Sequence, residues 1–85
     1  MGRIPRGVGM IYIITANTGD AESLIRRNNI DVVDSEWTYV ASCYHIMYLR
    51  PTDIVVFGRN WENRTDSGLI RILTQKTQAY VFEED

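Results

Sequence analysis

The sequence predicts an α/β fold, in which strands and helices alternate along the chain and the strands form a parallel sheet. Short runs of β-branched and aromatic residues alternate with segments whose apolar residues recur at helical spacing. The order is strand-helix three times, followed by a closing strand. In addition, residues 53–58 read Asp-Ile-Val-Val-Phe-Gly. An apolar run without alternation is typical of a strand buried on both faces of a parallel sheet.

The first strand and helix are predicted from residue type and spacing. Residues 11–15, Ile-Tyr-Ile-Ile-Thr, form a β-branched and aromatic run that favours a strand. A polar turn follows, in which Thr18 and Asp20 are both candidate helix N-caps. Apolar residues then recur at helical spacing over residues 21–27. Residues 30–34, Ile-Asp-Val-Val-Asp, are the expected second strand, which is short and partly alternating, as an edge strand is.

The longest predicted helix begins at Ser35, a candidate N-cap, and ends before Pro51. Its apolar residues form two adjacent stripes with only a narrow polar line between them, which is typical of a helix buried on more than one side. In so small a domain the second burying surface would have to come from another copy, so we expect a homo-oligomer, most simply a homodimer. The first stripe consists of Trp37, Val40, Ala41, Tyr44 and Tyr48. The second, which we expect at the oligomer interface, consists of Tyr39, Cys43, Ile46 and Leu49.

The last part of the chain supplies the remaining helix and strand, and the burial of the strands predicts the sheet order. The third strand leads through a polar loop to residues 66–68, Asp-Ser-Gly, after which helical spacing resumes at residues 69–73. Residues 79–83 form the expected last strand. Because strands one and three look the most buried, the expected order is 2-1-3-4 with right-handed crossovers. The predicted architecture is a single three-layer Rossmann-like or flavodoxin-like domain with a four-stranded parallel sheet and three helices, the first of them alone on one face.

The sheet order also predicts where a ligand would bind. In open parallel sheets this is the crevice at the carboxyl ends of the strands where the winding direction reverses, here between strands one and three. Both loops at that point lead into helix N-termini, whose free N–H groups attract anions. A tryptophan in the second loop would stack on a base, and an aspartate and a serine would hold hydroxyl groups, although capping and turn roles explain residues 66–68 equally well. The predicted ligand-binding residues are Asn17, Thr18, Gly19, Gly58, Trp61, Glu62, Asp66, Ser67 and Gly68.

Composition narrows the range of partners. The formal net charge of −2 argues against broad binding to a nucleic-acid backbone, so direct nucleic-acid binding is not expected. No apolar run approaches the ~20 residues that a membrane span needs. One cysteine, Cys43, allows no internal disulfide and fits a cytoplasmic setting. With only one histidine, His45, beside it, we expect neither a metal site nor a cofactor. Residues 1–9 are expected to form a flexible arm, native or vector-derived, ahead of a single domain at 10–85.

Five short motifs cover most of the chain in a fixed order. They are Ile11-Tyr12-Ile13 in the first strand, Val32-Val33-Asp34-Ser35, Asp53-Ile54-Val55-Val56 in the third strand, Trp61-Glu62, and the turn Asp66-Ser67-Gly68. This layout resembles the nucleoside 2-deoxyribosyltransferase-like family, especially a small branch of unknown function found in phage and bacterial genomes. The resemblance implies a nucleoside pocket on this α/β fold.

The same resemblance implies that the transferase chemistry is missing. The transferases carry a nucleophilic glutamate four residues after the glycine of the last motif, and Ile72 occupies that position here. An aliphatic side chain cannot attack an anomeric carbon. The first loop has Ala16-Asn17 where the family has Gly-Pro. We therefore expect a binding or assembly role rather than glycosyl transfer.

A second resemblance involves residues 32–37 and Cys43. This stretch is similar to the last strand and helix of BRCT domains, in which a tryptophan opens the helix, and it would imply phosphopeptide or protein recognition in DNA repair. The preceding stretch is too short for the first two strands and the helix of that fold, and the long loop and last strand do not fit it.

Three functions follow from the sequence. The first is a nucleotide- or nucleoside-binding module without catalysis. The second is a homo-oligomeric structural or regulatory interaction module without a small-molecule ligand. The third is a residual hydrolase or transferase, because paired carboxylates with split pKa values perform acid-base chemistry. Its candidate groups are Asp34, Glu36, Glu62 and Asp66.

Overall fold

The computed structural model describes residues 10–28 and 36–84. Within these residues the chain forms four strands, two α-helices and two short 3-10 helices. In chain order they are β1 (Met10–Ile14), α1 (Thr18–Arg27), β2 (Glu36–Tyr39), η1 (Cys43–Ile46), β3 (Ile54–Phe57), η2 (Trp61–Asn63), α2 (Ser67–Gln75) and β4 (Tyr80–Glu83). The predicted arm at residues 1–9 and the predicted strand at 30–34 lie outside the described residues.

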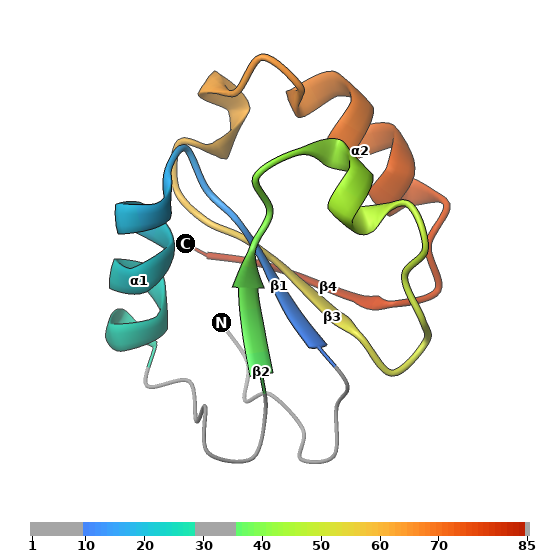
Figure 1. Ribbon diagram of the computed structural model, residues 1–85, viewed down its shortest axis with the longest axis horizontal. Helices are drawn as coiled ribbons and strands as arrows, with labels where there is room; N and C mark the ends of the chain where they lie inside the picture. The colour runs from blue at the N-terminus through green and yellow to red at the C-terminus, as the bar shows by residue number, and fades with distance from the viewer. Residues whose placement is uncertain (1–9, 29–35, 85) are drawn as a thin grey trace.

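The four strands form one parallel sheet in the order β2-β1-β3-β4 (Figure 1). This confirms the predicted α/β class, the parallel pairing and the order 2-1-3-4. The register places Ile11 opposite Ile54 at one end of the central pair and Ile14 opposite Phe57 at the other. All four residues of β3 are buried, as its unbroken apolar run predicted.

The predicted helix over residues 35–50 is wrong, so the described residues contain two α-helices instead of three. Residues 36–39 form β2, which pairs with β1, and only the short turn η1 is helical in the rest of the segment. Trp37 and Tyr39 are two residues apart and share one face of the sheet, where both pack against the same core cluster. The aromatic and β-branched residues of this strand thus follow period 2, and their strand preference prevails over the helical spacing.

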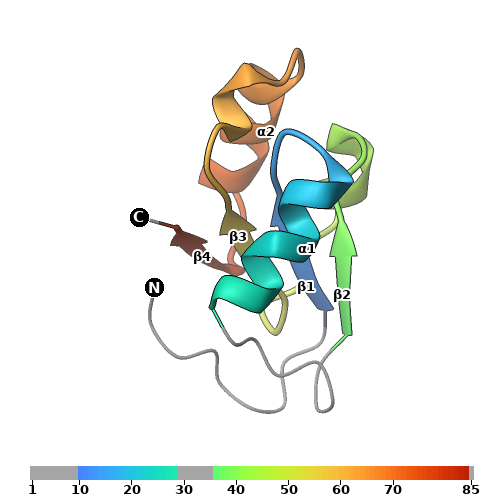
Figure 2. The ribbon, with the colours of Figure 1, turned by 90° about the vertical axis from the view of Figure 1, so that its left-hand side faces the viewer.

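The two faces of the sheet carry separate core clusters. On one face, Ile11, Ile13 and Val56 pack against Leu24 of α1. On the other face, a second cluster joins residues of β1 and β3 to η1, η2 and α2, including Ile70. Among the helices of the described residues, Figures 1 and 2 show α1 alone on its side of the sheet and α2 beyond the other side, as the strand order predicted.

Helix α1 is held at both ends by polar contacts. Its N-cap is Asn17, not Thr18 or Asp20, and the Asn17 side chain accepts a hydrogen bond from the Asp20 amide at 2.8 Å. At the other end, Arg27 donates to Glu84 at 2.6 and 3.1 Å, and the Asn28 amide donates to the same carboxylate at 2.8 Å. The hydrogen bond from Arg27 is the main cause that lowers the pKa of Glu84. These contacts attach the end of α1 to the residue after β4.

Asp53 connects β1 to the turn before β3 at the N-terminal edge of the sheet. It is buried, and its two carboxylate oxygens accept hydrogen bonds from the amides of Met10 and Arg50 at 3.0 and 2.9 Å. Asp53 therefore orders the start of β1 and the turn before β3, at the sheet edge opposite the predicted ligand site.

No helix in the described part of the chain is long and apolar enough to cross a membrane.

Candidate functional site

The loops after β1 and β3 meet at the carboxyl edge of the sheet, as the strand order predicted. The Gly58 amide donates to the Ile14 carbonyl at 2.8 Å and so extends the central pair by one residue. Gly58 is buried, and a Cβ at this position would overlap the Thr15 methyl group and come within 2.9 Å of Leu24 Cδ1. Close packing between the two loops and α1 therefore explains this glycine, which the sequence assigned to a ligand.

Arg64, in the loop before α2, joins the ends of three strands. Its guanidinium donates to the carbonyls of Thr15, Val40 and Ala41 and to both carboxylate oxygens of Asp66. The distances to Asp66 are 2.8 and 3.0 Å. An arginine has five N–H donors, so these five bonds use all of them. The side chain is only 7% exposed, and we call this arrangement the Arg64 clamp.

A pocket of about 250 Å³ opens beside the Arg64 clamp. It lies where the loops that follow β1, β2 and β3 come together. Tyr39 supplies an aromatic ring, over which the Arg64 guanidinium carbon lies 5.6 Å from the ring centroid. Thr65 and Asp66 supply a hydroxyl and a carboxylate. The lining residues are Ala16, Tyr39, Ala41, Arg64, Thr65 and Asp66, which we call the switch-point pocket.

Of the predicted ligand-binding residues, Asp66 alone lines the switch-point pocket. It is the N-cap residue of α2, but its side chain makes no capping bond to the helix because Arg64 binds the carboxylate. Ser67 and Gly68 form the first turn of α2, and Gly68 is exposed, with no atom outside its chain neighbours and its own helix backbone within 4 Å of the position of a Cβ. Their helix-start role explains the Asp-Ser-Gly sequence without a ligand.

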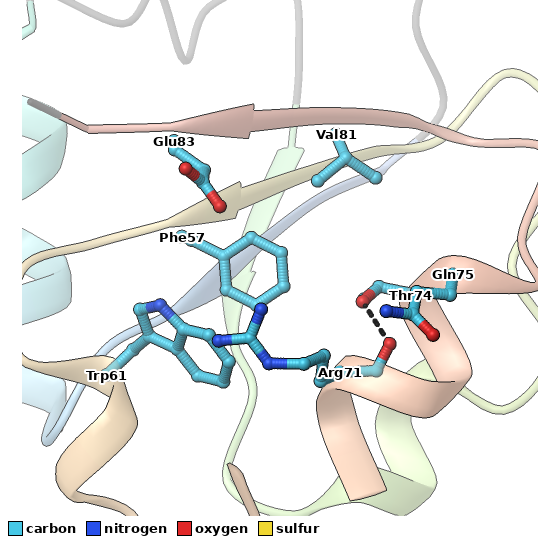
Figure 3. Close-up of a pocket in the computed structure, with 7 residues that line it drawn as sticks. All are labelled: Phe57, Trp61, Arg71, Thr74, Gln75, Val81 and Glu83. Atoms are coloured by element: carbon cyan, nitrogen blue, oxygen red, sulfur yellow. Dashed lines mark hydrogen bonds between the residues drawn. The ribbon is translucent and has the colours of Figure 1, made fainter. Parts of the chain in front are cut away.

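The structure places the remaining predicted residues elsewhere. Asn17, Thr18 and Gly19 are exposed at the start of α1, and Asn17 is engaged as its N-cap. Glu62 is exposed on η2. Trp61 is 5% exposed, its ring centroid is 4.5 Å from that of Phe57, and it lines a separate pocket on the α2 side of the sheet (Figure 3).

The residues predicted for an oligomer interface do not share one exposed face. Ile46 is buried at 2% exposure, and Cys43 and Leu49 pack against the core cluster on the α2 side. Tyr39 lies on the α1 face, at the end of β2. The exposed aromatic residues of this segment are instead Tyr44 and Tyr48, at 74% and 88% exposure, both of which belong to the first predicted stripe.

The candidate acid-base residues are also separated. Glu36 begins β2 and pairs in register with Met10 at the N-terminal edge of the sheet, opposite Asp66. Asp34 lies outside the described residues. His45 is exposed, and its Nδ1 accepts a hydrogen bond from the Ala41 amide at 3.2 Å. Within residues 10–28 and 36–84, no group of three or more His, Cys, Asp or Glu side chains is arranged to hold a metal ion.

Sequence reasoning did not identify Arg64 or Thr65 as residues of this site, and it assigned Tyr39 to a different role. One signal was available for Arg64, because it stands two residues before Asp66 in a loop already expected to close over the sheet.

Comparison with protein-family models, with curated proteins and with solved structures finds no match for this chain.

Proposed function

We propose that this chain binds a nucleoside in the switch-point pocket and does not carry out glycosyl transfer. The observation that carries the proposal is the position of the pocket, at the carboxyl edge of a parallel sheet where the winding direction reverses. The resemblance to the nucleoside 2-deoxyribosyltransferase-like family points to the same place and ligand class.

The lining of the pocket suits one ring of a nucleoside. A volume of about 250 Å³ is just below the ~300–1,000 Å³ of sites that enclose drug-sized ligands, so the pocket is of the size that holds a sugar or a base. Asp66 is 22% exposed, and each carboxylate oxygen retains a lone pair beyond its bond to Arg64. That carboxylate and the Thr65 hydroxyl would hold sugar hydroxyl groups, and the Tyr39 ring would contact the base.

The charges of the pocket favour a neutral nucleoside over a nucleotide. Arg64 is the one cationic side chain in the lining, and the Arg64 clamp already uses its five donors. Asp66 places a negative charge at the pocket surface. A phosphate group would meet this carboxylate without gaining a donor from the arginine, so phosphorylation of the ligand should weaken binding.

The arrangement of carboxylates supports binding without catalysis. Ile72, at the position of the transferase nucleophile, is 50% exposed on α2. Asp66 is held by Arg64, Glu62 is exposed on η2, and Glu36 begins β2 at the other end of the sheet. A glycosidic bond at the switch-point pocket would therefore meet one engaged carboxylate rather than the two that general acid-base hydrolysis uses.

Amide chemical shifts measured during titration test this proposal. Adenosine, thymidine and deoxyadenosine should perturb amides of residues 39–41 and 64–66, and the matching monophosphates should bind about tenfold more weakly, which corresponds to ~1.4 kcal/mol. Thr65→Val should weaken nucleoside binding several-fold. The matched control is Thr52→Val, at an exposed threonine before β3 and away from the pocket. Absence of any perturbation at millimolar nucleoside, or equal binding of the monophosphates, would contradict the proposal.

A second candidate function is self-association, which one observation favours. Four large apolar or aromatic side chains are at least 50% exposed: Tyr44 in η1, Tyr48 just after it, and Leu69 and Ile72 on α2. The two elements η1 and α2 are in contact. Aromatic and aliphatic side chains gathered on adjoining elements suit a contact with a second copy. Light scattering should then give a dimer mass at micromolar concentration, reduced to the monomer mass by Tyr48→Ser. A monomer mass for the unaltered chain would remove this candidate.

A further inference from the structure

A second pocket, of about 220 Å³, lies on the α2 side of the sheet, away from the Arg64 clamp. Strands β3 and β4 form one wall of it, and α2 and the residue that begins η2 form the other (Figure 3). Its lining includes Phe57, Trp61, Arg71, Val81 and Glu83. We call it the β4 pocket.

The arginine of the β4 pocket, Arg71, is oriented by an aromatic ring and has unused hydrogen-bond donors. The guanidinium carbon of Arg71 lies 5.1 Å from the centroid of the Trp61 ring, and Trp61 is in turn packed on Phe57. Stacking on a buried indole orients the planar guanidinium, and a planar guanidinium binds a carboxylate through two parallel hydrogen bonds. Within the described residues Arg71 makes neither an ion pair nor a side-chain hydrogen bond, so its donors remain available.

A carboxylate faces the same pocket from the opposite wall. Glu83 lies on β4, and Figure 3 shows its side chain directed from the strand toward the space above Phe57. No ion pair joins it to Arg71 within the 4.0 Å that defines one, and no other described residue neutralises it. The β4 pocket therefore presents one positive and one negative group that do not satisfy each other. A ligand that carries both charges would satisfy both.

Three further lining residues, Phe57, Thr74 and Val81, restrict the ligand. Val81 and Phe57 provide apolar surface in the same pocket. The Thr74 hydroxyl donates to the Ile70 and Arg71 carbonyls of its own helix at 3.0 Å, so it offers no donor to the pocket. We infer that the β4 pocket binds a free α-amino acid with an apolar side chain. Its carboxylate would bind to Arg71, its ammonium to Glu83, and its side chain would lie against Val81 and Phe57.

Three probes that share the leucine side chain and differ in which charges they carry test this inference. Leucine carries both charges, leucinamide keeps the ammonium alone, and N-acetyl-leucine keeps the carboxylate alone. Leucine should perturb amides near Trp61, at residues 71–75 and at 81–83, and each single-charge probe should bind about tenfold more weakly, because one charge-assisted hydrogen-bonded contact is lost. These amides differ from those of the switch-point pocket, so the two proposals succeed or fail independently.

Two variants assign the charges to individual residues. Arg71→Gln should weaken leucine and N-acetyl-leucine about tenfold and leave leucinamide unchanged. Glu83→Gln should weaken leucine and leucinamide and leave N-acetyl-leucine unchanged. Both side chains are exposed, so the fold should persist, and amide dispersion checks this. Arg26→Gln, at an exposed arginine on α1, is the matched control. Equal binding of all three probes, no binding of leucine, or the same response of every probe to both variants would overturn the inference.

Discussion

Replacement of Arg64 by alanine is expected to lower the free energy of unfolding by about 3 kcal/mol, the low end of the cost of removing one partner from a buried ion pair, because Asp66 is 22% exposed. The change leaves the carbonyls of Thr15 and Val40 without this donor, and both residues are at most 1% exposed. It also leaves the Asp66 carboxylate unpaired. Because small domains are stable by only ~5–15 kcal/mol, this single change should remove a large part of the total.

Urea denaturation followed by tryptophan fluorescence measures the effect, since Trp61 is in the core. Arg64→Lys should fall between the wild type and alanine, because lysine keeps the charge but offers three donors in place of five. Arg26→Ala is the control, since this exposed arginine on α1 should change stability by less than ~0.5 kcal/mol. A loss below ~1 kcal/mol for Arg64→Ala would show that water replaces the Arg64 clamp at little cost.

The Arg64 clamp also shows which part of the site local patterns could not predict. Strand order follows from the apolar runs, and the order alone places the loops after β1 and β3 at one edge. Which carbonyls remain unpaired at the ends of those strands depends on where each strand stops. The contacts of one side chain with three strand ends produce no periodic pattern in the sequence. Arg64 was therefore not distinguished from an ordinary polar loop residue.

The error over residues 35–50 has a different physical origin. Trp37, Val40 and Tyr44 fit the spacing of a helix, while Trp37 and Tyr39 fit the alternation of a strand. A segment this short is compatible with both patterns. Pairing with β1 settles the choice, because the register brings Trp37 opposite Ile11 and Tyr39 opposite Ile13, on the face that α1 covers. Long-range pairing of this kind is not visible in one segment. Because of the same error, the residues predicted for an oligomer interface do not form an exposed helix face: Ile46 is buried, and Tyr39, Cys43 and Leu49 are half-buried.

Substitution of Gly58 by alanine is expected to destabilise the domain by about 1–3 kcal/mol, the range for overpacking a well-filled core. The added methyl group would overlap Thr15 Cγ2 and come within 2.9 Å of Leu24 Cδ1. Leu24 is fully buried, and the Thr15 side chain is held by the hydrogen bond from its Oγ1 to the Asn17 carbonyl at 2.7 Å. The methyl group of Thr15 cannot turn away unless that bond breaks, so the strain falls mainly on the loop that opens α1.

A double substitution separates this overlap from a general loss of backbone fit. Thr15→Ser removes the methyl group that alanine 58 would meet and keeps the hydroxyl that bonds to Asn17. Gly58→Ala should therefore cost at least 1 kcal/mol less in the Thr15→Ser background, a coupling within the range for residues in contact. Gly68→Ala is the opposite control: no atom outside its chain neighbours and its own helix backbone lies within 4 Å of its Cβ position in the first turn of α2, so alanine there should stabilise by about 0.4–1 kcal/mol. Equal costs of Gly58→Ala in both backgrounds would show that steric overlap with Thr15 is not why a glycine stands between the central strand and the loop.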